Sequence, residues 1–295
     1  MRITGGMMIT TLLADLRRAQ QRLSTYQNRL ASGKRVQRPS DDPVATVDSL
    51  RLRARLAEVE RLRANAQDAR DWLEMTDGAL DRAGQIVQRA RELAIRAASG
   101  TLPDSSLDAI AAEVQQLRDH LLEVANSTLG GVYLFGGYRT NQPPYAVDPA
   151  SPTGVAYNGD GGAIEREIAP GVTLAVNVPG DAAFDPAFAA LAQLATALAA
   201  RDLDTVGGAA VAALDGALDG LLRWRAAVGA KVNRIELGLN RLDEVRIDTE
   251  RLLSDVEDAD IAETAMRLAV SEAAYRAALM AGARIVQPTL MDFLR

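Results

Sequence analysis

The N-terminal stretch from Ile9 to Pro43 reads ITTLLADLRRAQQRLSTYQNRLASGKRVQRPSDDP. Its apolar residues recur at alternating intervals of three and four, at Ile9, Leu12, Leu16, Ala19, Leu23, Tyr26 and Leu30. This is the heptad spacing of a coiled-coil helix, whose apolar seam has to be covered by a partner helix. The stretch therefore predicts a long amphipathic helix that needs a partner.

The end of this helix is marked by Gly33, because glycine readily adopts the left-handed conformation found just past a helix C-terminus. Asp42 is placed to cap a second helix and Pro43 to open it, since proline at the first helical position loses no needed N–H group. The sequence thus predicts a tight break between two helices.

Motifs at both ends of the chain resemble those of the flagellin family. They are LASGKRV at residues 30–36, PSDDP at residues 39–43, and LMAGARIVQPTLMDFL at residues 279–294. The PSDDP form and the Asp292-Phe293-Leu294 ending are similar to the hook-associated members of the family rather than to the filament subunit, flagellin.

The resemblance implies a structural protein of the bacterial flagellum that joins the hook region to the flagellin filament. It implies self-association into a ring or helical layer, with hook-associated protein 1 and flagellin as neighbours and an export chaperone before secretion. It also implies that the protein is secreted through the flagellar type III export channel to the hook–filament junction. By itself the sequence shows no secretory signal and indicates a cytoplasmic protein.

The expected assembly interface comprises the apolar seams of the two terminal helices and the turn after the first helix. Its residues are Ile9, Leu12, Leu16, Leu23, Tyr26, Leu30, Gly33, Asp41, Asp42, Leu268, Tyr275, Leu279, Val286 and Leu290. The pattern leaves open whether the terminal seams cover only each other or also face other subunits, and the resemblance favours other subunits.

The interior of the chain carries longer seams. One runs without a slip through Val59, Leu62, Ala66, Ala69, Leu73, Thr76, Leu80, Ala83, Val87, Ala90, Ala94 and Ala97. A third helix follows Pro103, and a returning helix has a seam from Val232 to Val256 that is interrupted at Arg246. The last helix carries Ile261, Ala265, Leu268, Tyr275, Leu279 and Val286.

Between Val132 and Gly180 the helical period is replaced by short β-type runs. These runs are Val132–Phe135, Val155–Tyr157, Ile164–Ile168 and Val172–Val178, and the sequence NGDGG at residues 158–162 is a turn signal between two of them. A short helix from Phe184 to Ala200 is expected to close this insertion.

The predicted fold is mainly α, a long antiparallel coiled-coil-like helical rod with a small β-rich insertion domain. Residues 1–43 form the N-terminal helix of a terminal coiled coil, and residues 257–295 form its C-terminal helix. Residues 44–130 and 204–256 are the ascending and returning parts of the rod, and residues 131–203 form the outer insertion.

Composition narrows the function classes. Aromatic residues make up only 4% of the chain and cysteine is absent, which excludes disulfides and thiol chemistry. A net charge of −6 argues against a surface for nucleic acid, which would be basic. No run of eighteen apolar residues is present, so no membrane partner is expected.

No arrangement of residues predicts catalysis, a cofactor or a metal. His120 is the single histidine, and with Glu123 one turn away it is interpreted as part of a solvent-facing surface. The acidic run Asp255, Glu257, Asp258 and Asp260 lacks the glycine and spacing of a calcium loop and is interpreted as a solvated helix junction.

Two other interpretations stay open. The chain could be a short flagellin, in which case it would elongate filaments instead of adding a limited layer. It could also be a coiled-coil signalling stalk, which would require a membrane anchor or a sensor partner and has no use for a β-rich insertion. The chain is not expected to be an enzyme.

Overall fold

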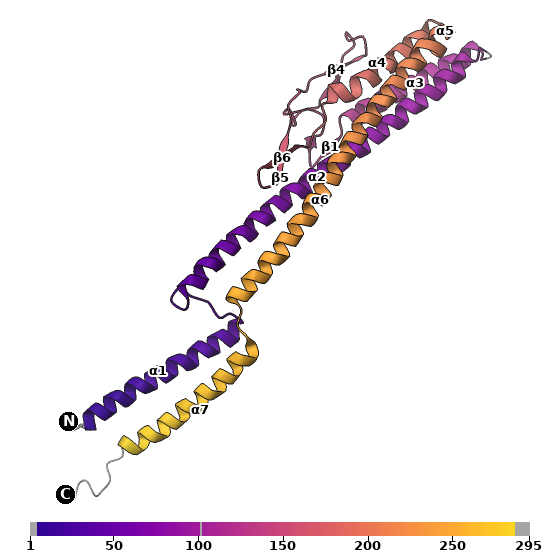
Figure 1. Ribbon diagram of the computed structural model, residues 1–295. Helices are drawn as coiled ribbons and strands as arrows, with labels where there is room; N and C mark the ends of the chain where they lie inside the picture. Colours follow the sequence, from indigo (N-terminus) through magenta and orange to yellow (C-terminus); the bar gives the residue numbers. More distant parts are fainter. Residues whose placement is uncertain (1–4, 101, 287–295) are drawn as a thin grey trace, which may run out of the picture. The chain divides into compact units, whose positions relative to one another are not determined.

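The computed structural model describes residues 5–100 and 102–286, with side chains for residues 7–100 and 102–283. By its contacts the chain divides into a terminal unit, Met1–Glu58 with Arg246–Arg295, and a central unit, Val59–Val245. The elements in chain order are α1 (Gly5–Ser32), α2 (Pro43–Ala98), α3 (Asp104–Ala125), β1 (Thr128–Leu129), β2 (Val132–Tyr133), β3 (Tyr145–Val147), β4 (Val155–Tyr157), β5 (Glu165–Ala169), β6 (Val172–Ala175), α4 (Gly180–Ala199), α5 (Leu203–Thr205), the π-helical turn η1 (Val206–Ala210), α6 (Val211–Glu257) and α7 (Ile261–Val286) (Figure 1).

In the central unit, α2 and α6 run antiparallel and are joined along their length by ion pairs. Arg63 contacts Asp243 at 3.0 Å, and Arg91 contacts Asp215 at 2.5 Å. Every residue of the predicted α2 seam from Val59 to Ala97 is buried. This prediction is therefore confirmed, because the seam is covered within one chain.

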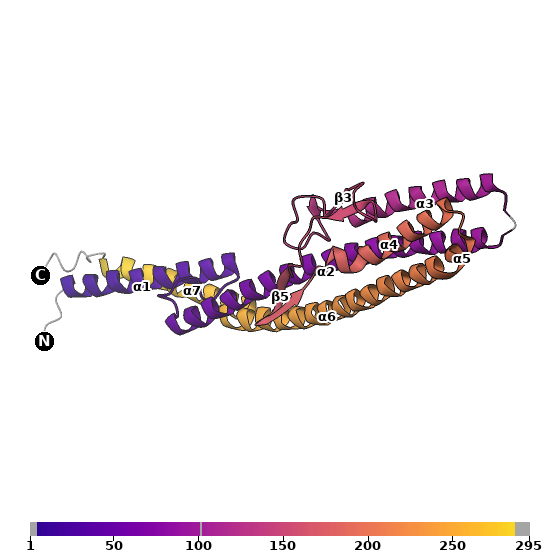
Figure 2. The same cartoon turned by 90° about the horizontal axis from the view of Figure 1, so that it is seen from above.

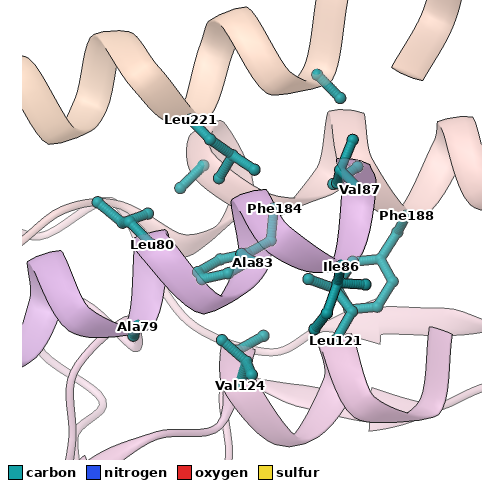
Figure 3. Close-up of a cluster of buried hydrophobic side chains, with 14 of the residues drawn as sticks. Ala79, Leu80, Ala83, Ile86, Val87, Leu121, Val124, Phe184, Phe188 and Leu221 are labelled. Carbon is teal, nitrogen blue, oxygen red and sulfur yellow. The ribbon is translucent and has the colours of Figure 1, made fainter. Parts of the chain in front are cut away.

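The core of the central unit also draws on α3 and α4. Figure 2 shows α4 between α3 and α6, and the Trp224 indole N–H of α6 donates to the Ala182 carbonyl of α4 at 3.2 Å. Leu80 of α2, Leu121 of α3, Phe184 of α4 and Leu221 of α6 meet in one apolar cluster (Figure 3). The many alanines of α2 have small side chains that let the neighbouring helices approach closely.

The β-rich insertion consists of three separate antiparallel pairs, β1–β2, β3–β4 and β5–β6. Strand β4 has the predicted bounds, whereas β1 and β3 lie outside the predicted runs. The segment 158–162 is not the hairpin turn that its sequence predicts, because β4 already pairs with β3. Instead, Asp160 anchors it by accepting hydrogen bonds from the N–H groups of Tyr138 (2.7 Å) and Gly162 (2.9 Å).

The fold class is confirmed as mainly α with a small β-rich insertion. Within the described residues, α4 and the helical stretch Leu203–Glu257 are long and apolar enough to cross a membrane by composition. This is weak evidence, because buried core helices share these properties and α4 places Phe184 and Phe188 in the core. The division into five segments by chain order stays a prediction.

Candidate assembly interface

The terminal unit is built on the antiparallel pair α1 and α7, which lie side by side (Figure 1). Gly282 of α7 packs so closely on Leu12 of α1 that a Cβ atom on the glycine would lie 2.9 Å from Leu12 Cδ2. Both helices rise equally per residue, so equal steps from this contact place Leu16 level with Ala278 and Leu23 level with Ser271. At these levels large residues of α1 face small residues of α7, whereas Ala19 is level with Tyr275.

The predicted α1 seam is confirmed as the face of lowest exposure on that helix. Ala19 is buried, and Leu12, Leu16, Leu23, Tyr26 and Leu30 are half-buried. Ile9 remains 40% exposed near the end of the pair. A two-helix contact leaves the edges of its seam open, which is the thin cover expected from a single partner helix.

The predicted α7 seam is only partly correct. Leu268 and Tyr275 are half-buried on the α1-facing side, whereas Ile261, Ala265 and Leu279 are exposed. The low-exposure line on α7 is Thr264, Leu268, Ser271, Tyr275, Ala278 and Gly282. Its polar and small members do not stand out as apolar in the sequence. The Val286 side chain and Leu290 lie outside the described residues, and the assignment of all these positions to an assembly interface stays a prediction.

The turn between α1 and α2 is held by the residues predicted for it. Gly33 has φ of 70°, the left-handed conformation expected after a helix. The Asp41 carboxylate accepts from the N–H groups of Gln37 at 3.2 Å and Arg38 at 3.0 Å. Asp42 caps α2 by accepting from Ala45 N–H at 3.0 Å, and this hydrogen bond lowers the pKa of the Asp42 carboxyl.

A buried carboxylate lies where this turn meets the α6–α7 junction. Glu257 is 2% exposed, and each of its carboxylate oxygens lies 2.8 Å from the Arg53 guanidinium. Lys34 Nζ approaches Oε2 at 2.5 Å, and the Ser49 hydroxyl donates to Oε1. We call Lys34, Ser49, Arg53 and Glu257 the Glu257 cluster.

The electrostatics of the Glu257 cluster favour the ionised carboxylate. Hydrogen bonds from Arg53, then from Lys34 and Ser49, outweigh the opposing effect of burial and lower the pKa of Glu257 to about 2. Backbone hydrogen bonds join the same two segments, because Arg35 N–H donates to the Glu257 carbonyl at 2.6 Å and Ala259 N–H donates to the Gly33 carbonyl at 2.8 Å. The cluster therefore ties the α1–α2 turn to the α6–α7 junction.

The interpretation of residues 255–260 as a solvated junction is wrong for Glu257, although Asp255, Asp258 and Asp260 are exposed. No local pattern distinguishes Glu257 from its acidic neighbours. Its partners Arg53 and Lys34 are 204 and 223 residues away in the chain, so only the folded arrangement identifies it.

The site offers packing and ion pairing. His120 and Glu123 are exposed on α3, as predicted. In the described ranges 5–100 and 102–286, no three His, Asp or Glu side chains are grouped in a way that could hold a metal ion. The arrangement can hold helices in register and present apolar surface to a partner.

Comparisons with known proteins match this chain to proteins of the bacterial flagellum. A family model for the bacterial flagellin N-terminal helical region matches residues 3–140. The chain is 27% identical over 311 residues to flagellar hook-associated protein 3 of Escherichia coli strain K12, covering 94% of this chain and 96% of that protein. It is 25% identical over 240 residues to flagellin of Halalkalibacterium halodurans, covering 81% of this chain and 78% of that protein.

Solved structures agree on the fold. Flagellar hook-associated protein 3 from Legionella pneumophila superposes with a TM-score of 0.64 at 16% identity, covering 70% of this chain and 98% of that structure. Bacillus cereus FlgL superposes with a TM-score of 0.61 at 22% identity, covering 69% and 99%.

Proposed function

Because this chain is homologous to flagellar hook-associated protein 3 and carries the flagellin N-terminal helical region, we infer that it is a structural protein of the flagellar hook–filament junction. It is an exported component of the flagellum. The observation that carries this function is the match to hook-associated protein 3, which extends over 94% of the chain and 96% of the relative.

The terminal unit is the part through which we propose that the protein assembles. Its described buried apolar side chains are only Ala19, Val36 and Ala45, whereas the central unit buries Phe135, Phe184, Phe188 and many leucines. A unit with so little apolar core gains stability when neighbouring subunits cover its exposed apolar surface. The family relationship supports hook-associated protein 1 on one side, flagellin on the other and further copies of this chain as its neighbours. It also supports binding of an export chaperone before secretion.

The test is a strain lacking this chain, examined by electron microscopy. The expected picture is hooks without filaments, with flagellin released into the medium, and restoration of filaments by the intact gene. Filaments of normal length on the hooks of the deletion strain would contradict the junction role.

A flagellin function is the second candidate, since flagellins also match much of the chain. It is less supported, because the flagellin of Halalkalibacterium halodurans matches a smaller share of both chains than hook-associated protein 3 does. Purified protein added to filament seeds distinguishes the two functions. A junction protein adds a limited layer, whereas a flagellin elongates the seeds.

A further inference from the structure

The irregular segment after β4 contains the only Asn-Gly pair of the sequence, Asn158-Gly159. Hydrogen bonds hold this segment on both sides of the pair. The N–H of Asn158 donates to the Pro144 carbonyl at 2.7 Å, and the N–H of Asp160 donates to the Gly136 carbonyl at 3.2 Å. The peptide bond that joins Asn158 to Gly159 lies between these two contacts.

The groups within the pair are themselves free. Asn158 is exposed, and in the part of the chain that the structure describes, neither its side-chain amide nor the N–H of Gly159 takes part in a hydrogen bond. Asn177 in the same insertion is fixed instead. Its amide N–H donates to the Gly162 carbonyl at 2.7 Å, and its side-chain oxygen accepts from the Ile164 N–H at 2.9 Å.

A free asparagine side chain that is followed by glycine can react with its own backbone. The Gly159 nitrogen loses its proton to water or hydroxide and attacks Asn158 Cγ. The N–Cγ bond forms while the Cγ–Nδ2 bond breaks, and Nδ2 leaves as ammonia with a proton from water. Glycine favours this cyclic imide, because it has no side chain to crowd the ring and its backbone rotates freely. Water then opens the ring, at Cγ to give aspartate or at the main-chain carbonyl carbon to give isoaspartate.

Packing requires the glycine that makes this reaction possible. A Cβ atom on Gly159 would overlap the hydroxyl of Tyr157. That hydroxyl is held in place by its contacts with the carbonyl oxygens of Phe135 at 2.9 Å and Asp160 at 3.2 Å. A larger residue that would slow the reaction of Asn158 therefore does not fit at position 159.

The surroundings of Asn158 also favour one of the two products. Arg139 Nη1 donates to the Asn158 main-chain carbonyl at 3.2 Å. This contact polarises the carbonyl carbon at which water attack gives isoaspartate, and the same guanidinium can pair with the carboxylate that results. We propose that Asn158 is a site of spontaneous deamidation and that isoaspartate is its main product.

The product changes the backbone of the insertion. An isoaspartyl chain runs through Cβ and Cγ, so it is longer by one atom between the contact at Asn158 and the contact at Asp160. The Asp160 carboxylate accepts from the N–H of Tyr138 at 2.7 Å, and the longer backbone displaces it. The modification therefore loosens the segment of the insertion that Asp160 anchors.

Peptide mapping tests the reaction. Full-length protein is kept in a mildly alkaline buffer made with heavy-oxygen water, digested with trypsin and analysed by mass spectrometry with fragmentation. Cleavage after Arg139 and Arg166 places Asn158 in one peptide with Asn141, an exposed asparagine followed by Gln142, which is the internal control. We expect at least about tenfold more conversion at Asn158 than at Asn141, because only Asn158 precedes glycine.

Heavy oxygen in the product identifies water as the reactant, and isoaspartate should exceed aspartate. Asn158→Gln, whose longer side chain would have to form a larger ring, should leave the position unconverted. Conversion of Asn158 no greater than that of Asn141, or aspartate as the main product, would overturn the proposal.

Hydrogen exchange tests the effect on the segment. Protection of the Tyr138 amide should fall about tenfold in native protein that has been aged until it contains isoaspartate, because its hydrogen bond to Asp160 is lost. Asn158→Gln aged in the same way should keep this protection. Freshly prepared Asn158→Asp carries the new charge on an unchanged backbone and should keep it as well. Full protection in the aged native protein, or an equal loss in fresh Asn158→Asp, would contradict displacement by the longer backbone.

Discussion

A single carboxylate, that of Glu257, connects the end of α6 to the α1–α2 turn and the start of α2, which are more than 200 residues away in sequence. It forms ion pairs with both Lys34 and Arg53 while being almost inaccessible to water. Burial of the carboxylate costs desolvation free energy, which the hydrogen bonds from Arg53, Lys34 and Ser49 offset, so the cluster gives little net stability when compared with an apolar replacement. Glu257 therefore fixes the geometry of the junction more than it adds to overall stability.

Replacement of Glu257 by Gln keeps the shape of the side chain and removes its charge. Because the neutral amide cannot make the charge-assisted hydrogen bonds that lower the pKa of this carboxyl from 4.5 to about 2, we expect the terminal unit to lose about 3 kcal/mol of local stability, equal to a drop of about 100-fold in amide protection at residues 33–36 and 256–260 in hydrogen-exchange mass spectrometry. Glu263→Gln, in an exposed pair with Arg267, is the control and should change protection by less than about threefold. Unchanged protection in Glu257→Gln would show that the Glu257 cluster does not stabilise the junction.

The pH dependence follows from the same carboxylate. Its pKa is about 2 in the folded chain, below the ordinary value of 4.5, so its stabilising effect is complete above pH 4.5 and is lost as the pH falls from 4.5 towards 2. Protection at residues 33–36, corrected for the intrinsic exchange rate at each pH, should fall over this range in the native chain. It should be less dependent on acid in Glu257→Gln. Identical profiles would contradict this origin of the acid sensitivity.

Gly33 offers a test of backbone conformation alone, because no heavy atom beyond its two chain neighbours lies within 4 Å of the position that a Cβ would occupy. Gly33→Val should cost about 1–2 kcal/mol through its left-handed φ and reduce motility with normal protein levels. Gly33→Asn should cost less, since asparagine tolerates this conformation. Swarming assays with immunoblots of the secreted protein give the measurement, and normal motility of the valine variant would argue against a role for the turn.

Gly33, Asp42 and Glu257 differ in whether their roles could be predicted from the sequence. Gly33 and Asp42 could be predicted because the rules for helix ends involve only nearby residues. Glu257 could not, because the burial of a carboxylate depends on partners contributed by distant segments.

At the scale of elements, a predicted helix seam was correct where its apolar residues formed one continuous face, and less so where small residues lined the contact. The α2 seam is rich in leucine, valine and alanine in unbroken heptads, and its burial followed the pattern. On α7 the apolar residues Leu279 and Met280 face away from α1, while Ala278 and Gly282 face it. A helix with apolar residues on more than one side has no single face that sequence can identify, and the partner decides which side is covered.

The strands of the insertion were predicted less well for a related reason. Strands of two or three residues, such as β1 and β3, are too short to show a period of two. Their pairing also depends on contacts outside the strands. The Asn126 side chain binds both the N–H and the carbonyl of Tyr145 at the start of β3, at 3.0 and 2.9 Å.

Because the α2 seam is covered within one chain, substitutions in this seam should lower the stability of the monomer itself. Leu73 and Leu80 are fully buried, so Leu73→Asp or Leu80→Asp places an unpaired charge in the core and costs several kcal/mol. We expect the monomer to melt about 10 °C lower in either variant. Leu237→Asp on α6, where Leu237 is 71% exposed, is the control, and a melting temperature unchanged in all three variants would contradict the intramolecular core.

At the scale of the whole molecule, the two units differ in how much of their stability lies within one chain. Ordering a residue costs roughly 1–2 kcal/mol of backbone entropy, and the α1–α7 pair leaves most of its seam side chains only half-buried. The central unit instead encloses a continuous core from four helices. In the dilute monomer we therefore expect α1 and α7 to open far more often than the central unit does.

Limited digestion of the full-length monomer with subtilisin tests this difference. Cleavage should remove most of α1 and α7 and stop near the Glu257 cluster, which ties residues 33–36 to residues 256–260, leaving a fragment of about residues 33–260 that no longer assembles. In Glu257→Gln the tie is weakened, so trimming should continue towards the central unit, Val59–Val245. Fragment masses and circular dichroism give the boundaries and the helix lost. Resistance of α1 and α7 in the monomer, or assembly by the trimmed fragment, would contradict the proposal that the terminal helices gain their stability from neighbouring subunits.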